Sequence, residues 1–154
     1  MISLRPAVTL MDAWAMYRWR NHVTTRERMR TTTRIGMAEH WRWFKGAIGS
    51  PTHLPMLAWE DGRRVGYVLI NFKDGANTTA EVSIAVAPRL RGRGIGTRIL
   101  DELAVVSARH YSSVRLVAVV KRSNGPSLRS FRKSGFTTAV FDQESEFIVL
   151  EKRC

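Results

Sequence analysis

Apolar residues in the first third of the chain recur at the three- and four-residue spacing of helices. Trp41, Phe44 and Ile48 form one such row, and a Gly-Ser-Pro run directly after them ends it. Thr9 is of the residue type that caps a helix start, and Pro6 ends the short run before it. The expected elements here are an edge strand and three helices, over residues 2–5, 10–22, 25–30 and 37–48.

The rest of the chain alternates strand and helix patterns. Asp61-Gly62 between two apolar runs predicts a hairpin. Ile95, Ile99 and Leu103 mark one face of a helix, and the β-branched run after that helix is expected to be parallel to the strand before it, because a helix connects them. The expected strands are 55–60, 63–72, 79–87, 113–120, 136–141 and 146–151, and the expected helices are 95–109 and 127–134, the latter ended by Gly135. This order is α+β with a mixed sheet.

Length and composition fit a single domain over residues 1–154. A hydrophobic content of 44% with five tryptophans is typical of a globular protein. No run of about 18 apolar residues predicts a membrane span. The first residues lack the basic segment and apolar stretch of a secretory signal, so we expect a cytoplasmic protein.

Cysteine and histidine usage argues against a disulfide or a metal site. Cys154 is the only cysteine, so an intramolecular disulfide cannot form. The four histidines stand apart, without paired cysteines or short His spacing. We therefore expect no metal.

The formal net charge of +12 fits a nucleic-acid binder or a protein that binds small anions. Basic residues are scattered through the expected helices and loops rather than gathered in one run. We therefore favour small anionic ligands over RNA or DNA, an order that a tight stoichiometric RNA complex would reverse.

The most informative stretch lies between the expected strand 79–87 and helix 95–109. It reads Arg-Leu-Arg-Gly-Arg-Gly-Ile-Gly-Thr from Arg89 to Thr97, with glycines at alternate positions. Glycines let the backbone approach a ligand and turn its N–H groups inward, while the following helix adds the positive end of its dipole. The loop is therefore expected to bind a pyrophosphate; the alternative is an ordinary glycine-rich turn.

Its spacing differs from two familiar nucleotide-binding loops. A dinucleotide fingerprint, Gly-x-Gly-x-x-Gly, counted from Gly92 meets Thr97 where the third glycine should stand. A Walker A loop counted from Gly92 requires Gly-Lys-Ser/Thr after four residues, and the chain has Thr97-Arg98 there. Neither nucleotide fold is supported.

Arg91, Gly94 and Gly96 instead spell Arg-x-x-Gly-x-Gly directly after a strand, which resembles motif A of the GNAT N-acetyltransferases. A second segment, from Asn124 to Phe136, is similar to that family's Asn-x-x-Ala/Ser-x-x-x-Tyr-x-x-x-Gly-Phe pattern. The resemblance covers roughly residues 60–150. It implies a GNAT fold, in which helices flank a mixed central sheet and two strands splay apart around acyl-CoA, with acetyl-CoA as co-substrate.

In that family, motif A holds the coenzyme through backbone groups. The resemblance implies that the loop amides hold the pyrophosphate, that Ile84, Ala85 and Val86 meet the pantetheine arm, and that the N–H near Val86 polarises the thioester carbonyl. The alternative interpretation of Ile84, Ala85 and Val86 is that they belong to an ordinary core strand. The alternative interpretation of Asn124 is that it caps the following helix. The coenzyme-binding residues implied are Ile84, Ala85, Val86, Arg91, Gly92, Arg93, Gly94, Ile95, Gly96, Thr97, Asn124, Ser127 and Phe131.

The reaction implied is direct transfer of acetyl from a thioester to a primary amine, which must first lose a proton. Glu81 is the expected proton acceptor, directly or through water, because several family members carry an acidic residue near this place. Ser83 and His40 are the alternatives, and the other interpretation of Glu81 is an exposed carboxylate at a strand end. The Val86 N–H completes the expected catalytic set.

Phe131 departs from the family pattern, since many members carry there a tyrosine thought to protonate the leaving thiolate. A phenyl ring cannot donate that proton. The thiolate must leave unaided, through water, or with help from a hydroxyl such as that of Tyr67 or Tyr111. Because a free thiol has a pKa of about 8.5, departure as thiolate is feasible near neutral pH.

The N-terminal third is expected to bind the acceptor. Its Trp-Arg-Asn run and spaced Ile, His and Phe resemble the nucleotide-amino-sugar acetyltransferases of pseudaminic acid synthesis, and also the ribosomal-protein N-terminal acetyltransferases. The arginines would bind phosphates, and the aromatic side chains would pack against a base or a sugar. The other interpretation is that the aromatic residues are helix core and the arginines a solvated face. The acceptor-binding residues implied are Arg20, Asn21, Arg28, His40 and Phe44.

We therefore expect an acetyl-CoA-dependent N-acetyltransferase whose preferred acceptor is a nucleotide-linked amino sugar. One alternative acceptor is a protein or peptide amine. The other alternative is a non-catalytic acyl-CoA-binding module, which the phenylalanine at position 131 keeps open. The sequence also leaves open whether the protein forms a homodimer.

Overall fold

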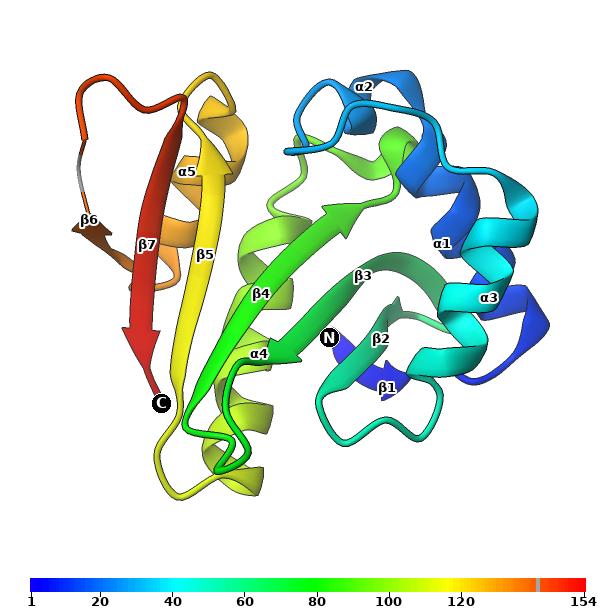
Figure 1. The fold of residues 1–154 in the computed structure, drawn as a ribbon, viewed down its shortest axis with the longest axis horizontal. Helices are drawn as coiled ribbons and strands as arrows, with labels where there is room; N and C mark the ends of the chain where they lie inside the picture. The colour runs from blue at the N-terminus through cyan, green and yellow to red at the C-terminus, as the bar shows by residue number, and fades with distance from the viewer. Residues whose placement is uncertain (141) are drawn as a thin grey trace.

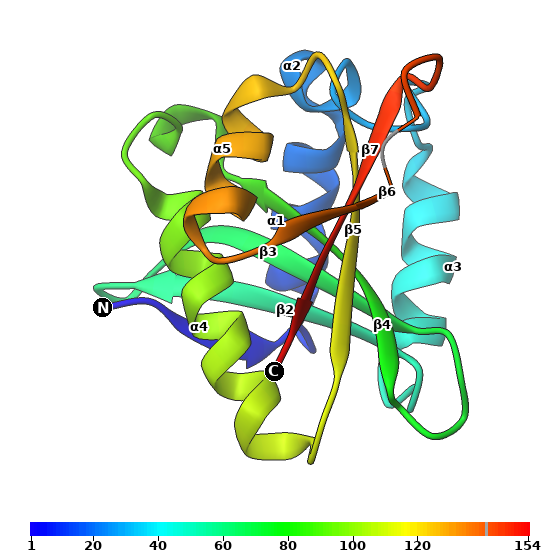
Figure 2. The ribbon, with the colours of Figure 1, turned by 90° about the vertical axis from the view of Figure 1, so that its left-hand side faces the viewer.

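The computed structural model describes residues 1–140 and 142–154, in which a seven-stranded sheet lies between two layers of helices (Figure 1, Figure 2). The strands are β1 (Ser3–Pro6), β2 (His53–Glu60), β3 (Arg63–Phe72), β4 (Thr79–Val86), β5 (Arg115–Lys121), β6 (Thr137–Val140) and β7 (Phe147–Arg153). The helices are α1 (Leu10–Asn21), α2 (Val23–Arg26), α3 (Met37–Ala47), α4 (Ile95–His110) and α5 (Gly125–Lys133), with a 3-10 turn η1 (Pro88–Leu90).

The strand order is β1-β2-β3-β4-β5-β7-β6, and every neighbouring pair is antiparallel except β4 and β5. The β2–β3 hairpin turns at Asp61 and Gly62, whose φ angles are 49° and 73°, as the Asp-Gly pair predicts. Helix α4 carries the chain from β4 to β5, so these two strands are parallel. The predicted α+β class and mixed sheet are confirmed.

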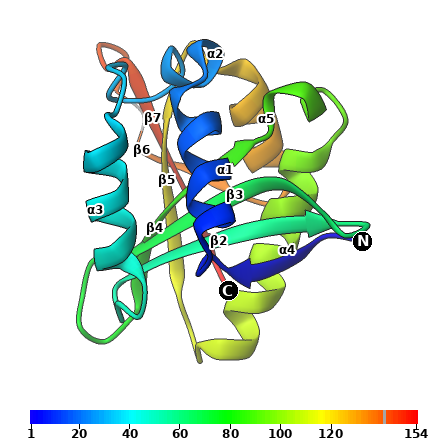
Figure 3. The same cartoon turned by 90° about the vertical axis from the view of Figure 1, so that its right-hand side faces the viewer.

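Each face of the sheet has its own core, because successive strand residues point to opposite faces. On β4, Val82 packs in one cluster with Leu103 of α4. Ala85 packs in the other cluster, with Met16 of α1 and Phe44 of α3. Helices α4 and α5 therefore cover one face, and α1 and α3 lie side by side over the other (Figure 2, Figure 3).

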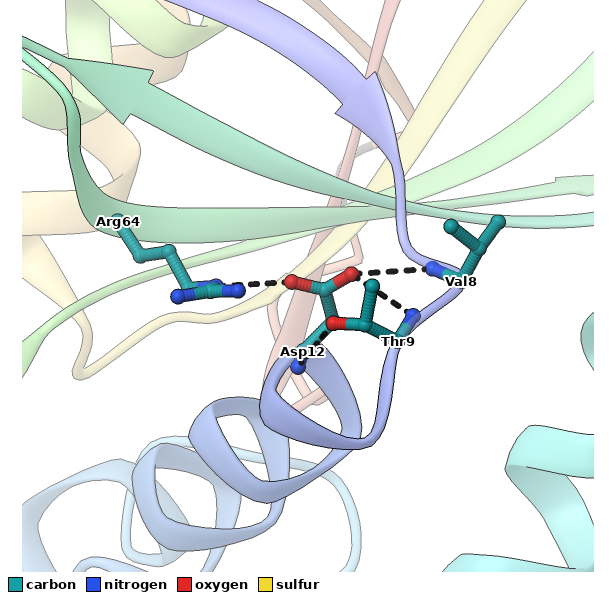
Figure 4. A network of polar contacts seen from close by, with 4 residues as sticks. All are labelled: Val8, Thr9, Asp12 and Arg64. Carbon is teal, nitrogen blue, oxygen red and sulfur yellow. Dashed lines mark hydrogen bonds and ion pairs between the residues drawn. The ribbon is translucent and has the colours of Figure 1, made fainter.

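Helix α1 is fixed to the sheet at its first turn by Asp12 (Figure 4). The Asp12 carboxylate accepts the N–H groups of Val8 and Thr9 at 3.1 and 3.0 Å, and the Thr9 hydroxyl accepts the Asp12 N–H at 3.1 Å. From β3, Arg64 donates its Nε–H to Asp12 at 2.8 Å. Burial raises the pKa of the Asp12 carboxyl, but the hydrogen bonds lower it further, so it lies below its ordinary value. Thr9 thus caps the helix, as predicted.

Helix α2 is shorter than expected and begins earlier, at Val23 rather than residue 25. From the glycine loop, Arg91 donates to the hydroxyls of Thr24 and Thr25 at 2.5 Å each. The residues after α2 are held by side chains from elsewhere, since Arg20 donates to the Thr31 carbonyl at 2.9 Å. Over residues 27–29 the backbone continues as a local turn, with the Glu27 N–H donating to the Val23 carbonyl at 3.1 Å, but it does not form a longer helix.

Several other boundaries differ from the sequence-based expectation by one or two residues. Strand β2 begins at His53, and α5 begins at Gly125 because the Asn124 side chain accepts the Ser127 N–H at 3.3 Å and so caps the helix two residues early. The strand expected over 136–141 is β6, Thr137–Val140. Residue 141 lies outside the described residues.

Candidate functional site

Strands β4 and β5 are neighbours over a short distance only. Their register runs from the pair Thr79–Arg115 to the pair Glu81–Val117 and then stops, although β4 continues to Val86. Figure 1 shows the two strands diverging beyond this point. We call the space between them, beyond the Glu81–Val117 pair, the strand gap.

The backbone groups of Ile84 and Val86 face this gap. The Ala87 N–H donates to the Val65 carbonyl of β3 at 2.9 Å. Because successive residues of a strand direct their amide groups to opposite edges, those of Val86 and Ile84 point toward β5. The Val86 carbonyl accepts from Arg91 Nε at 3.4 Å. The Val86 N–H, the expected oxyanion donor, is therefore directed into the gap.

The glycine loop leads from β4 into an uncapped helix start. Gly92 and Gly94 have φ angles of 78° and 70°, which favour glycine. Gly94 is the N-cap of α4, and α4 has neither a side-chain cap nor an acidic residue in its first turn. In the part of the chain that the structure describes, the N–H groups of residues 91–97 donate to no protein acceptor. Free amides at the positive end of a helix form an anion site.

A pocket of about 360 Å³ lies over this loop. Four of its lining side chains are cations, those of Arg28, Arg91, Arg129 and Lys133, and none of its lining residues in the described chain is acidic. This charge suits a ligand with several phosphate groups. The pocket is lined by eleven of the thirteen expected coenzyme-binding residues, all except Arg93 and Phe131.

The side chain of Arg91 is directed away from the loop amides. Its guanidinium binds the hydroxyls of Thr24 and Thr25. Burial lowers the pKa of this guanidinium, and the nearby charge of Arg28 lowers it too. Arg91 therefore joins α2 to the glycine loop through its side chain, while its backbone belongs to the anion site.

The start of α5 forms another wall of the pocket. Asn124 lines the pocket and also caps α5, so the helix cap is observed and its contact with the pantetheine stays a prediction. Gly96 lies so close to α5 that a β-carbon there would be 3.2 Å from the Ser130 hydroxyl oxygen. The third glycine of the loop thus permits close packing of α4 against α5.

Several lining residues were not identified from the sequence. Pro126, Ser130 and Lys133 fall at helical spacing on one face of α5, so projecting that face from the Asn124 cap would have found them. Thr25 and Met29 also line the pocket. No sequence signal marks Thr25, because a long-range bond from Arg91 holds it.

Phe131 is buried in the core rather than at the pocket. Its ring is 2% exposed and meets the ring of Phe136 edge to face, with the centroids 4.9 Å apart. Of the two alternative hydroxyl donors, Tyr67 is buried beside Arg20, and burial raises its pKa to about 12. Tyr111 is half-buried and packs against Phe72 of the core. None of these rings lines the pocket.

Glu81 is the last residue of β4 that pairs with β5. Its side chain is 19% exposed and forms ion pairs with Arg30 and with Lys73, whose Nζ lies 2.9 Å from Oε2. Burial raises the pKa of the Glu81 carboxyl, but the two cations lower it further, so it lies below its ordinary value. Ser83 follows on the same strand with an exposed side chain.

Two of the expected acceptor residues hold the segment after α2. The Asn21 amide donates to the Ile35 carbonyl at 2.9 Å and accepts the Ile35 N–H at 2.8 Å. Arg20 Nη2 donates to the Thr31 carbonyl, and Arg20 Nη1 is buried without a partner in the described chain. Arg28 alone of the expected acceptor residues lines the pocket.

His40 and Phe44 lie in the core between α1 and α3. The His40 Nε2 atom is 2.8 Å from the Ala13 carbonyl oxygen, which assigns the proton to Nε2 in the neutral ring. Burial lowers the pKa of His40, despite the opposing effect of this hydrogen bond. Phe44 is 1% exposed and stacks on Trp41. Both rings therefore pack between the helices, and neither lines the pocket, so their contact with the acceptor stays a prediction.

The described residues contain no group of His, Cys, Asp or Glu that could hold a metal ion. Likewise, no helix among them has both the length and the apolar character that crossing a bilayer requires.

Comparison with known proteins agrees with this geometry. Residues 13–136 match the model of the acetyltransferase (GNAT) family. Acetyltransferase PseH of Campylobacter jejuni is 24% identical over 132 residues, which cover 86% of this chain and 80% of PseH.

Solved structures show the same fold. The crystal structure of C. jejuni N-acetyltransferase PseH in complex with acetyl coenzyme A has a TM-score of 0.73 at 20% identity, over 99% of this chain and 98% of that one. The structure of AAC(6')-Ib with ribostamycin and coenzyme A has a TM-score of 0.81 at 17% identity, over 98% of this chain and 92% of that one. The predicted fold is thereby confirmed.

Proposed function

The chain belongs to the GNAT acetyltransferase family, and from this premise we propose that it transfers acetyl from acetyl-CoA directly to the amine of a nucleotide-linked amino sugar. One observation carries the coenzyme part of the proposal: the amides of residues 91–97 have no protein acceptor in the described chain and border a pocket lined by four cations. These groups suit the phosphates of acetyl-CoA, and the free edge of β4 suits its pantetheine arm.

The residues at the strand gap fit direct transfer without a covalent enzyme intermediate. The amine nitrogen attacks the acetyl carbonyl carbon, and the negative charge that develops on the oxygen is stabilised by the Val86 N–H. Glu81 accepts the amine proton, directly or through one water. The carbon–sulfur bond then breaks, and the sulfur leaves as thiolate because Phe131 supplies no proton.

Support for the acceptor comes from the N-terminal third. Its Trp-Arg-Asn run resembles the nucleotide-amino-sugar acetyltransferases of pseudaminic acid synthesis, and the similarity to PseH extends over 86% of the chain. In the structure, Arg20 and Asn21 hold the segment that carries Arg28 and Arg30. We assign Arg20 and Asn21 a positioning role. Arg28 is the residue that contacts the phosphate of the acceptor.

A thiol-release assay over separate pools of amines tests the proposal. The purified protein is given acetyl-CoA with nucleotide-linked amino sugars, with peptides carrying free N-termini, or with simple amines. Release of CoA that requires the nucleotide amino sugar supports the proposal, and release with peptides alone favours the peptide acceptor. Tight acetyl-CoA binding with no CoA release from any pool would show a binding module instead.

A further inference from the structure

The carboxylate of Glu81 is already occupied by two cations of the protein itself. Arg30 pairs with Oε1, and Lys73 lies 2.9 Å from Oε2. The strand neighbours Asn71 on β3 and Val117 on β5 carry no charge, so these two cations decide the electrostatics of Glu81. An acceptor amine that binds Oε1 directly therefore competes with Arg30 for that oxygen.

Arg30 is the cation that can leave. Lys73 follows β3 directly, and its N–H donates to the Thr79 carbonyl at 2.9 Å, which fixes its backbone in the sheet. Arg30 lies between α2 and α3, in a stretch without helix or strand. That stretch is held mainly by side chains, such as Arg26 on the Thr32 carbonyl at 3.2 Å. The side chain of Arg30 is 56% exposed, so leaving Glu81 places its charge in water at little cost.

We propose that Arg30 is a displaceable counter-ion of Glu81: the ammonium group of the acceptor takes its place at Oε1, and the freed guanidinium binds an anionic group on the same acceptor. Such an acceptor carries an amine together with a phosphate or carboxylate. Arg28 and Met29, directly before Arg30, line the coenzyme pocket, so the segment that carries Arg30 borders that pocket. The inference rests on the proposed function, in which Glu81 accepts the amine proton.

The exchange also accounts for the path of the proton. The bound ammonium passes one proton to Glu81 Oε1, and the nitrogen lone pair released in this way forms the bond to the acetyl carbon while the carbon–sulfur bond breaks. The nitrogen then gives its second proton to the departing thiolate, so the products are the neutral amide and the CoA thiol. After the amide product leaves, Arg30 returns to Oε1. Because Lys73 and Arg30 both lower the pKa of the Glu81 carboxyl, the return of Arg30 drives the proton to solvent. The carboxylate is then ready for another ammonium.

A titration of the Glu81 carboxyl tests the pairing without any turnover. Carbon-13 NMR of side-chain carboxyls is recorded against pH for the wild type and Arg30→Gln, with Glu81→Gln to assign the signal. Arg34→Gln is the matched control, since Arg34 lies in the same segment with an exposed side chain. The pKa of Glu81 should rise in Arg30→Gln and stay unchanged in Arg34→Gln. The same Glu81 pKa in the wild type, Arg30→Gln and Arg34→Gln would overturn the proposal.

A pair of acceptors tests the exchange itself. Butylamine and 4-aminobutyl phosphate differ only in the anionic group. In Arg30→Gln, the KM for butylamine should fall because no counter-ion competes, while the KM for the phosphate should rise about tenfold, the effect of losing one charge-assisted bond. Arg30→Lys should restore part of the preference. If both KM values change in the same direction and by the same factor, Arg30 is only structural.

Failure of the proposed function looks different from failure of this inference. If the wild type releases no CoA with any amine, the transfer reaction is wrong. Calorimetric binding of 4-aminobutyl phosphate, compared between the wild type and Arg30→Gln, then still tests whether Arg30 holds the anion. If the wild type releases CoA and its KM is the same for butylamine and 4-aminobutyl phosphate, this inference alone is overturned.

Discussion

Gly94 shows how a single residue can serve the site through its backbone alone. Its φ of 70° places the next amides at the start of α4 facing the pocket, and no atom lies within 4 Å of where its β-carbon would be. A larger side chain at this position therefore meets no steric obstacle, and its cost comes from the left-handed backbone. Arg93 lies beside it and was expected to contribute charge, but its side chain does not line the pocket.

Replacing Gly94 by valine together with Arg93→Glu should weaken acetyl-CoA binding at least about 100-fold. The β-branched residue forces the loop out of the left-handed region, and the new carboxylate repels the phosphates, so at least two amide bonds to the phosphates are lost. Isothermal titration calorimetry measures the affinity. Gly75→Val, in the β3–β4 turn where Gly75 has no neighbour within 4 Å, is the control. Unchanged affinity in the double variant would remove the pyrophosphate site.

At the scale of elements, short-range patterns were enough for most of the fold. The glycine loop, the Asp-Gly hairpin and the Thr9 cap were predictable because each depends on residues within a few positions. The segment after α2 was not, because its path depends on Arg91, Arg20 and other residues far away in sequence. The placement of His40 and Phe44 in the core could not be separated from acceptor binding, since both fit the same helical spacing.

The first turn of α1 is an element whose stability should depend on pH. Asp12→Asn removes a charged acceptor for two N–H groups and for Arg64, and it should lower the free energy of unfolding by about 1–2 kcal/mol near neutral pH. Because the pKa of Asp12 is lowered in the folded state, its contribution is present above its unfolded value and is lost as pH falls through the folded one.

Urea denaturation measures this dependence near neutral pH and at a pH below the lowered pKa of the folded Asp12 carboxyl, which itself lies below the ordinary value of 3.8. The difference between wild type and Asp12→Asn should shrink at the lower pH, where both carry a neutral side chain. Asp61→Asn, at the hairpin turn, is the control, since asparagine tolerates the same positive φ. A difference that stays constant with pH would mean that the Asp12 charge contributes nothing.

At the scale of the molecule, the N-terminal and C-terminal parts of the sheet are joined by few bonds. Strands β1 to β4 form one part and β5 to β7 the other. Among the described residues these strands pair only where Thr79 to Glu81 meet β5, while one apolar core under α4 packs against both parts. Beyond that point the parts are linked by single side-chain bonds, such as Ser134 to the Thr97 carbonyl at 3.1 Å and Lys121 to the Glu27 carbonyl at 3.1 Å. A ligand in the strand gap would add bonds to both parts at once.

Acetyl-CoA should therefore stabilise the whole fold, and should do so through its phosphates. At 100 times its Kd the coenzyme adds about 2.7 kcal/mol, which corresponds to a rise in Tm of about 5–10 °C for a chain of this size. Because the lining cations Arg129 and Lys133 attract the phosphates, the rise should shrink as salt is added. Thermal unfolding with acetyl-CoA, and with pantetheine as the ligand that lacks phosphates, separates the contributions. An equal rise with pantetheine, or a full rise in Gly94→Val, would mean that the glycine loop does not hold the coenzyme.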